Sequence, residues 1–315
     1  MREIENLRGT LPGQEREGQV VGKRFFLLCL AAFLAIPSLS SASSKEIQTP
    51  SLIVTDGSGS YTDEQLGNLA KGAQETLEEI LALWSADAGL ERFGKIRVVF
   101  DAPRNENYSS VFFWEAKGDR RVRVVRVHGA KELPQMMAHK LTSAVFPQKD
   151  KLIRNMMGIL SEVKLGNPGT FPMCGFSCDE WALAFLELGL YLPLEKLGPD
   201  HGSWGMEDKG GGDLRAQDFG KQHRAYAEAG SFGHYLSETY GIDRIKRFHR
   251  LSVDKARPWQ AAFGLSLDEL EKNWLEALKS SPTVKPGNVS LLMDLFKQDP
   301  ETARNKARNL AGNQQ

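Results

Sequence analysis

Few side chains in this sequence have the types and spacing that catalysis needs, and the most suggestive group is the run His139-Lys140-Leu141-Thr142-Ser143. On a helix, Lys140 and Ser143 would lie one turn apart, where a desolvated lysine can activate a serine hydroxyl as a nucleophile. The competing interpretation is a solvated lysine and a serine that bonds back to its own helix. His139 is interpreted as a half-buried histidine that packs and hydrogen-bonds, unless other donors join it around a metal ion.

A catalytic zinc site would need further ligands beside His139, because such a site uses three fixed protein ligands. The other imidazoles show no i,i+4 pair, the spacing that presents two ligands on one helix face. They are His128, His201, His223, His234 and His249. His201, which follows Asp200, and His223 are the two that could approach His139. A rebuilt metallohydrolase site, with zinc as its cofactor, is therefore the alternative interpretation.

The N-terminal segment predicts export. Lys23 and Arg24 precede an apolar run over 25–36, and small residues follow up to a predicted cleavage after Ala42. The run is shorter than the roughly 20 residues that cross a bilayer. Residues 1–42 are therefore interpreted as a signal peptide, with an uncleaved anchor as the alternative. We expect a periplasmic or extracellular protein without a stable membrane span after cleavage. The long acidic leader favours a translation start near Val20 or Val21.

Export changes how the cysteines are interpreted. Cys29 leaves with the signal peptide, and Cys174 and Cys178 remain in the run Met-Cys-Gly-Phe-Ser-Cys. In an oxidising compartment this pair is a candidate disulfide, and two packed thiols are the alternative. Such a short loop would contribute only about 2 kcal/mol. The surrounding segment 166–178 is rich in glycine, proline and aromatic residues, which suits either a ligand-contact rim or a packed connector.

Composition bounds the class of protein. The 315 residues are 41% hydrophobic and 25% charged, which is typical of a soluble globular protein. Lys plus Arg and Asp plus Glu each total 40, so the overall charge gives no argument for a nucleic-acid partner or an anionic membrane surface.

The periodicity predicts an α+β fold with a β-rich part over 50–130 and a helical part over 131–280. Strands are expected at 51–55, 96–100, 110–114 and 122–127, and a long helix is expected from the N-cap Thr62, paired with Gln65, to about Gly89. The aromatic run Phe112 to Trp114 places aromatics on both faces of an edge strand. Further helices are expected at 132–146, 150–163, 179–192, 222–240, 242–252 and 266–280. Residues 200–220 are expected to form a mobile surface loop. Beyond the main domain, 43–280, residues 281–315 are expected to form a short helix at 289–296 and a fraying tail from Asp299.

Two stretches in the C-terminal half carry a resemblance to a known family. The first runs from Tyr226 through Gly230-Ser231-Phe232 to Tyr240-Gly241, and the second from Phe263-Gly264 to Trp274. They are similar to the C-terminal helices of the peptidase MA-like family of gluzincins, and the likeness extends by element order over about 50–280. The resemblance implies a zincin-like fold, with a small mixed sheet and helices followed by a helical subdomain.

The same resemblance implies a degenerate metal site. The family carries His-Glu-x-x-His after the edge strand, where the two imidazoles hold zinc and the Glu polarises its water. In this chain Lys140 replaces that Glu and Ser143 replaces the second His. The third ligand is a Glu on the next long helix, whose best match is Leu188; Glu187 is one residue out of register and is rotated by about 100°. Aligning Trp181 instead places Ala184 at that position. Tyr226 matches a residue near the cleft, where a phenol donates to an oxyanion or simply packs.

These observations predict a non-catalytic, exported member of the family. We expect it to need no cofactor and to act as a peptide- or protein-binding or scaffolding module through the vestigial cleft. In gluzincins the edge strand beside the cleft pairs with the substrate backbone, and that role would survive the loss of the metal.

Overall fold

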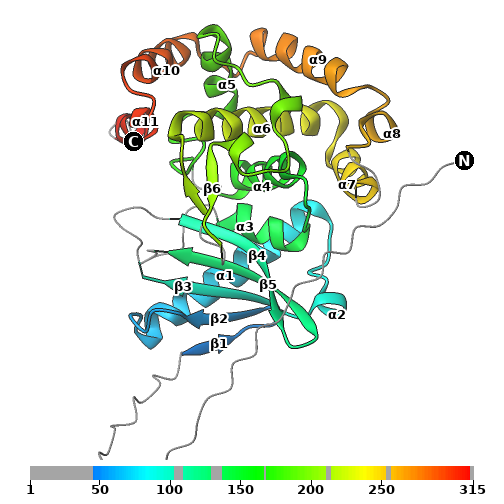
Figure 1. Cartoon of the computed structure of the whole chain (residues 1–315), viewed down its shortest axis with the longest axis vertical. Helices are drawn as coiled ribbons and strands as arrows, with labels where there is room; N and C mark the ends of the chain where they lie inside the picture. Colours follow the sequence, from blue (N-terminus) through cyan, green and yellow to red (C-terminus); the bar gives the residue numbers. More distant parts are fainter. Residues whose placement is uncertain are drawn as a thin grey trace, which may run out of the picture. The chain divides into compact units, whose positions relative to one another are not determined.

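A mixed β-sheet is followed by a largely helical region, which confirms the predicted α+β class (Figure 1). The computed structural model describes residues 45–102, 109–128, 137–166, 168–210, 214–252 and 257–312. The predicted signal peptide, Cys29 and the predicted translation start lie outside the described residues. No helix in the described part of the chain is both long and apolar enough to cross a membrane.

The sheet has the strand order β1-β2-β3-β5-β4. Its three central strands, β2, β3 and β5, run parallel, and β1 and β4 pair antiparallel at the two edges. The bounds are β1 (Glu46–Gln48), β2 (Leu52–Asp56), β3 (Ile96–Asp101), β4 (Ser109–Lys117) and β5 (Arg120–His128). All four predicted strands are confirmed, and β4 is the predicted edge strand. β1 was not predicted, because its three residues are too few to show a period.

One face of the sheet is covered by two helices that the sequence partly predicts. α1 (Asp63–Trp84) begins at the predicted N-cap, where Thr62 and Gln65 form a reciprocal capping box. Alternate residues of the sheet, such as Leu52, Val98 and Val125, are fully buried beneath it in the core. α3 (Met137–Val145) extends this cover and contacts α1, β4 and β5. The segment from 132 to 136, predicted to begin α3, lies outside the described residues.

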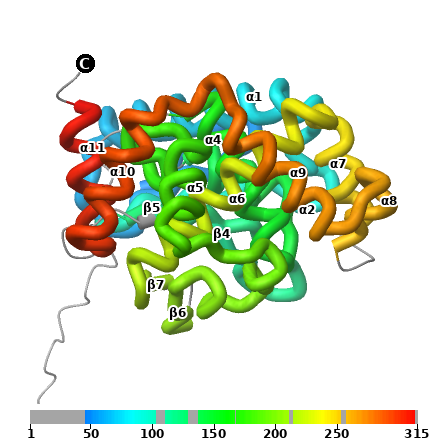
Figure 2. The backbone as a smooth tube through the Cα atoms, turned by 90° about the horizontal axis from the view of Figure 1, so that it is seen from above, coloured from blue at the N-terminus to red at the C-terminus, as the bar shows by residue number. Residues whose placement is uncertain are grey.

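The helical region is organised around α6. The helices are α4 (Lys151–Leu165), α5 (Cys178–Glu187), α6 (Phe219–Tyr240), α7 (Ile242–Leu251), α8 (Trp259–Phe263), α9 (Leu267–Lys279), α10 (Pro286–Gln298) and α11 (Ala303–Gly312). α6 contacts α4, α5, α7 and α9. Seen from above in Figure 2, α10 and α11 lie at one end of this region and α7 and α8 at the other.

A buried polar network explains several residues of the C-terminal sequence pattern. The Ser231 hydroxyl donates to Asp179 (2.6 Å) and accepts from the Trp274 indole (3.0 Å), so it joins α6 to α5 and α9. His234 contacts the other Asp179 carboxylate oxygen at 2.9 Å, which raises the pKa of the imidazole. These residues of the pattern therefore hold helices together.

Two expectations for the C-terminal half are wrong. The segment 200–220 contains a short 3-10 helix, η2 (Gly202–Trp204), and a hairpin of β6 (Met206–Asp208) and β7 (Leu214–Ala216), anchored by the fully buried Trp204. Residues after Asp299 form α11, because Ala303 and Ala307 are buried and Asp299 accepts bonds from the start of the turn. The described residues 281–312, expected to lie beyond the main domain, belong to the same compact unit as the rest of the described chain.

The sequence left a disulfide and two packed thiols open for the remaining cysteines. Cys174 and Cys178 are two buried free thiols instead of a disulfide. Cys178 starts α5 and packs closely against Gly230 of α6, while Cys174 lies 3.8 Å from the Arg308 guanidinium. The described residues 168–178 thus pack against α6 and α11, as in the packed-connector alternative that the sequence left open.

Arg123 ties the N-terminal end of β5 to the structure around it. Its guanidinium is fully buried and donates to the carbonyls of Ala88 (2.7 Å), Gly94 (2.6 Å) and Ala144 (3.1 Å). Desolvation lowers the pKa of the guanidinium to about 10. The carbonyls belong to the segments around α2 (Leu90–Phe93) and to the end of α3, so one side chain links three elements.

We predict that Arg123→Leu destabilises the fold by about 2–4 kcal/mol, because three carbonyls, two of them buried, lose their donor. Arg120→Leu, on the same strand but exposed, should change the free energy of unfolding by less than about 0.5 kcal/mol. Urea unfolding of both variants measures the difference. Equal stability of the two would show that Arg123 contributes no more than a surface arginine.

Candidate functional site

His139 lies at the interface of α3 and α4. Its ring is completely buried and packs against α4 where Gly158 leaves room; a methyl group at Gly158 would meet the ring carbon Cδ2 at 2.2 Å. On the other side, the Tyr226 ring of α6 lies 6.1 Å away. The carboxylate of Glu162, also on α4, accepts a 3.0 Å hydrogen bond from the His139 backbone. Three helices therefore fix His139 in place.

Three cations surround this position. Lys140 follows His139 on α3, and Lys151 and Arg154 come from α4, where their i,i+3 spacing places them on the same face. Arg154 lowers the pKa of both lysines, and Lys140 lowers the pKa of Lys151. We call Lys140, Lys151 and Arg154 the basic cluster.

Desolvation is the largest cause of the pKa shifts in the basic cluster. Burial, followed by the charge of Arg154, lowers the pKa of Lys140 to about 7, and nearby Glu162 offsets this only in part. The pKa of Lys151 is also lowered to about 7, by desolvation and then by Arg154 and Lys140. Each lysine therefore loses its charge close to neutral pH, although a free lysine stays protonated far above it.

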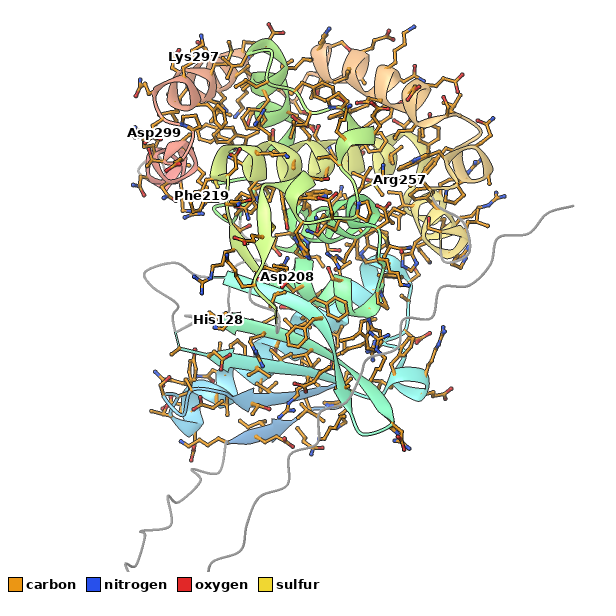
Figure 3. All side chains as sticks on the ribbon, viewed as in Figure 1. His128, Asp208, Phe219, Arg257, Lys297 and Asp299 are labelled. Atoms are coloured by element: carbon orange, nitrogen blue, oxygen red, sulfur yellow. The ribbon has the colours of Figure 1, made fainter. Side chains whose placement is uncertain are left out.

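The acids nearest the basic cluster are engaged elsewhere. Asp150 caps α4 through the amides of Leu152 and Ile153 and pairs with Arg257 at 2.7 Å. Asp200 accepts from Ser203. Asp208, labelled in Figure 3 at the end of β6, lies 3.7 Å from His201. Carboxylates nevertheless offset part of the charge: Glu162 acts on Lys140, Asp200 and Asp208 act on Lys151, and Asp150 acts on Arg154. The pKa of each cation is still lowered, because desolvation is the larger effect.

Lys151 has one close polar partner. Its ammonium lies 2.5 Å from Nδ1 of His201, just before η2, and the other ring nitrogen of His201 faces Asp208. Desolvation and the charge of Lys151 lower the pKa of His201. The neutral imidazole accepts from the ammonium, so the β6–β7 hairpin is connected to the basic cluster through a neutral group. Of the two histidines proposed to join His139, His201 thus contacts Lys151.

The remaining imidazoles have structural surroundings of their own. His223 is buried on α6, bonded to the Pro172 carbonyl at 2.8 Å, and desolvation lowers its pKa to about 3. His128 lies 3.8 Å from Asp101 on the sheet, and His249 packs edge-on against Phe146. The structure therefore does not bring these residues to His139.

The other predicted site residues are placed as follows. The Ser143 hydroxyl donates to the His139 carbonyl at 3.0 Å, the back-bonding arrangement that the sequence offered as the alternative to a Ser/Lys pair. Tyr226 lies beside His139, as its position in the pattern predicts. Its hydroxyl donates to Met206 at 3.4 Å, and its ring packs against Trp204 and Phe171.

Leu188 is not beside His139. It caps the C-terminus of α5, a helix whose main neighbours are α6 and α10, whereas α4 is the helix that packs on α3. The residue that α4 brings to the His139 backbone is Glu162. Leu188, matched to the third ligand position by resemblance, thus lies on a different helix from the one that packs on α3. Glu187 is likewise on α5.

The donors around His139 do not fit zinc. Lys140 and Arg154 both lower the pKa of His139, after desolvation, and their positive charges would repel a metal ion in the same way. Asn155, the other polar group facing the ring, is a neutral amide. Among the described residues, no three His, Cys, Asp or Glu side chains converge as a metal site. This surrounding chemistry favours an anion instead.

Comparison with family models, curated proteins and solved structures finds no match to this chain.

Sequence reasoning missed Lys151, Arg154 and Glu162. A signal was present: an amphipathic helix that carries Lys, Arg and Glu at 151, 154 and 162 on the same face as Gly158 has charges where apolar residues are expected. A polar stripe of this kind indicates either an exposed face or a functional one, and only the fold shows that it meets α3.

We predict that Gly158→Ala destabilises the protein by about 1–3 kcal/mol, because the added methyl group collides with the His139 ring. Gly67→Ala in α1, where the added carbon meets nothing, should instead stabilise by up to about 1 kcal/mol through helix propensity. In the double variant His139→Ala/Gly158→Ala the two changes should compensate in part, measured as a coupling free energy by denaturant unfolding. Strict additivity would mean that the two residues do not pack together.

Proposed function

We propose that this protein is an exported, non-catalytic member of the peptidase MA-like family that binds an acidic peptide or protein segment through the vestigial cleft. The observation that carries the proposal is the basic cluster: three desolvated cations next to His139, whose charge the neighbouring carboxylates offset only in part. The proposed fold is zincin-like, and the edge strand β4 beside α3 and the helices that carry the C-terminal pattern support it.

Electrostatics favours an anion as the group bound at the basic cluster. Burying positive charge without a partner is unfavourable, and a bound anion supplies the missing partner. Lys140 and Arg154 are half-buried residues whose charged groups are desolvated, which strengthens their attraction for an anion. A carboxylate suits the guanidinium of Arg154, which can donate two parallel hydrogen bonds to it.

The edge strand supports a peptide as the carrier of that carboxylate. β4 pairs only on its β5 side within the described sheet, and α3 lies against it. An extended peptide can add to such an edge through its backbone, while its side chains reach the neighbouring helix. Backbone pairing provides affinity, and the basic cluster provides selectivity for an acidic side chain.

The donor set does not favour the alternative function, a metallohydrolase rebuilt around His139. A cation at His139 would lie next to Lys140 and Arg154, and the histidines that could assist have other contacts. No zinc-dependent step is therefore proposed.

Calorimetric titration at pH 6.0 with the peptide Ac-Val-Glu-Val-Glu-Val-Glu-NH2 tests the proposal, because both lysines are then protonated. We expect the peptide to bind at the basic cluster. Lys140→Met/Arg154→Met should weaken this binding at least tenfold, since the carboxylate loses two cations. Lys164→Met on the exposed side of α4 is the matched control and should change affinity less than twofold. The peptide with Gln in place of Glu should not bind at the basic cluster.

Two results would contradict this function. The first is an affinity of the basic cluster that is the same for the Glu and Gln peptides. The second is about one tightly bound zinc per purified chain, removed by a chelator together with peptidase activity, which would establish the metallohydrolase instead.

A further inference from the structure

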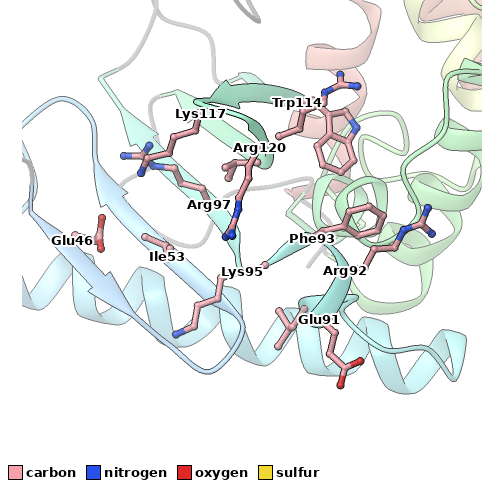
Figure 4. A pocket seen from close by; sticks show the side chains of 14 residues that line it. Glu46, Ile53, Glu91, Arg92, Phe93, Lys95, Arg97, Trp114, Lys117 and Arg120 are labelled. Carbon is pink, nitrogen blue, oxygen red and sulfur yellow. The ribbon is translucent and has the colours of Figure 1, made fainter.

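A second basic site lies at the far end of the sheet. A hollow of about 790 Å³ opens where β2, β3 and β5 begin, next to α2 and the β4–β5 hairpin (Figure 4). None of its lining residues belongs to α3 or α4, so this sheet-end hollow is separate from the basic cluster. It also goes beyond the function proposed above.

The charge of the sheet-end hollow is strongly positive. Six cations line it, against the two acids Glu46 and Glu91. The cations are Arg92, Lys95, Arg97, Lys117, Arg120 and Arg121. This imbalance is local, because the whole chain is neutral. Clustering of like charges in a concave surface focuses the field on an anionic ligand.

Two of these cations are fully available. Lys117 and Arg120 are exposed and lie opposite each other across the β4–β5 hairpin, and neither has an acidic partner within 4.0 Å in the described structure. Arg97 pairs with Glu115 at 3.6 Å, and Lys95 donates to the Thr49 carbonyl at 2.6 Å. Like charges placed directly opposite on a hairpin are destabilising, so an anion between them would relieve repulsion.

The hollow also has an apolar part. Ile53 and Val122 contribute side chains on the sheet face, and Phe93 and Trp114 meet edge-to-face at 5.4 Å at the α2 end. Arg92 stacks over Phe93 and Arg121 over Trp114, which holds the guanidinium groups at the rim. Aromatic and arginine side chains together are typical of protein-recognition surfaces.

We propose that the sheet-end hollow binds an acidic, partly apolar segment of a partner protein in extended form. The lining runs from Glu46 on β1 to Lys117 on β4, a distance of about 19 Å at roughly 4.8 Å per strand. An extended segment of about six residues covers that span, with carboxylates at the cations and apolar side chains on the floor. A flat bilayer cannot enter a concave site, and the mixed floor differs from a purely phosphate-binding groove.

The alternating Glu/Val peptide used above tests this site, because separate variants isolate the two sites. Lys117→Glu/Arg120→Glu should weaken peptide binding at the sheet-end hollow at least tenfold. It should leave the affinity of the peptide for the site of Lys140 and Arg154 unchanged. Lys272→Glu/Lys279→Glu, which reverses two exposed cations on α9, is the matched control and should retain both sites. Raising the salt concentration should weaken binding in the wild type.

Three outcomes would overturn the inference: no binding that depends on Lys117 and Arg120, tighter binding of a single-stranded oligonucleotide than of the peptide, or tighter binding of vesicles of anionic phospholipid. Peptide binding at the sheet-end hollow without binding at Lys140 and Arg154 would contradict the proposed function and support the inference. Peptide binding at Lys140 and Arg154 without binding at the sheet-end hollow would support the proposed function and contradict the inference.

Discussion

The close approach of α3 and α4 determines the arrangement of every group at the candidate site. Gly158 lets the His139 ring lie against the backbone of α4, which brings Lys140 of α3 next to Arg154 and Lys151 of α4. A side chain at Gly158 would meet the His139 ring, so the ring or the two helices would have to shift. The contact that buries a histidine therefore also concentrates positive charge.

That concentration is unfavourable for folding by itself. A protein that only needed to pack α3 on α4 would be more stable with neutral side chains at these positions, because desolvated charges cost free energy. Acids are present nearby, yet Asp150 and Asp200 also serve caps and turns, and Glu162 offsets the Lys140 shift only in part. Local charge that is not fully neutralised by the chain is a common property of ligand sites. The remaining positive charge is the reason for proposing an anionic ligand instead of a metal.

Parts of the fold could be predicted from the sequence where they depend on contacts between residues that are close together in the chain. The capping box at Thr62 and the β-branched strands are local signals, and they were predicted correctly. The hairpin within 200–220 was missed because its stability comes from burial of Trp204 against distant residues. Helix α11 was missed for the same reason, since its two buried alanines give a weak apolar pattern.

The candidate site shows the same division. His139 and Tyr226 were identified from their positions in the pattern, and they do lie together. Lys151, Arg154 and Glu162 were missed, because their role appears only when α4 is placed against α3. The third ligand position was assigned to Leu188 on α5 by matching residue types, and no local signal distinguishes α4 from α5 as the neighbour of α3.

The most direct test of the central claim, that the site holds positive charge that its neighbours offset only in part, is the stability of Lys140→Met as a function of pH. The pKa of Lys140 is lowered in the folded protein from its usual 10.5 to about 7. Between these values the unfolded chain binds a proton that the folded chain lacks, so wild-type stability rises with pH. The variant should therefore be more stable than the wild type by at least about 1 kcal/mol at pH 6. This gain should shrink as the pH rises from 7 towards 10. A variant that is equally or less stable at pH 6, or a difference that does not change with pH, would contradict the account.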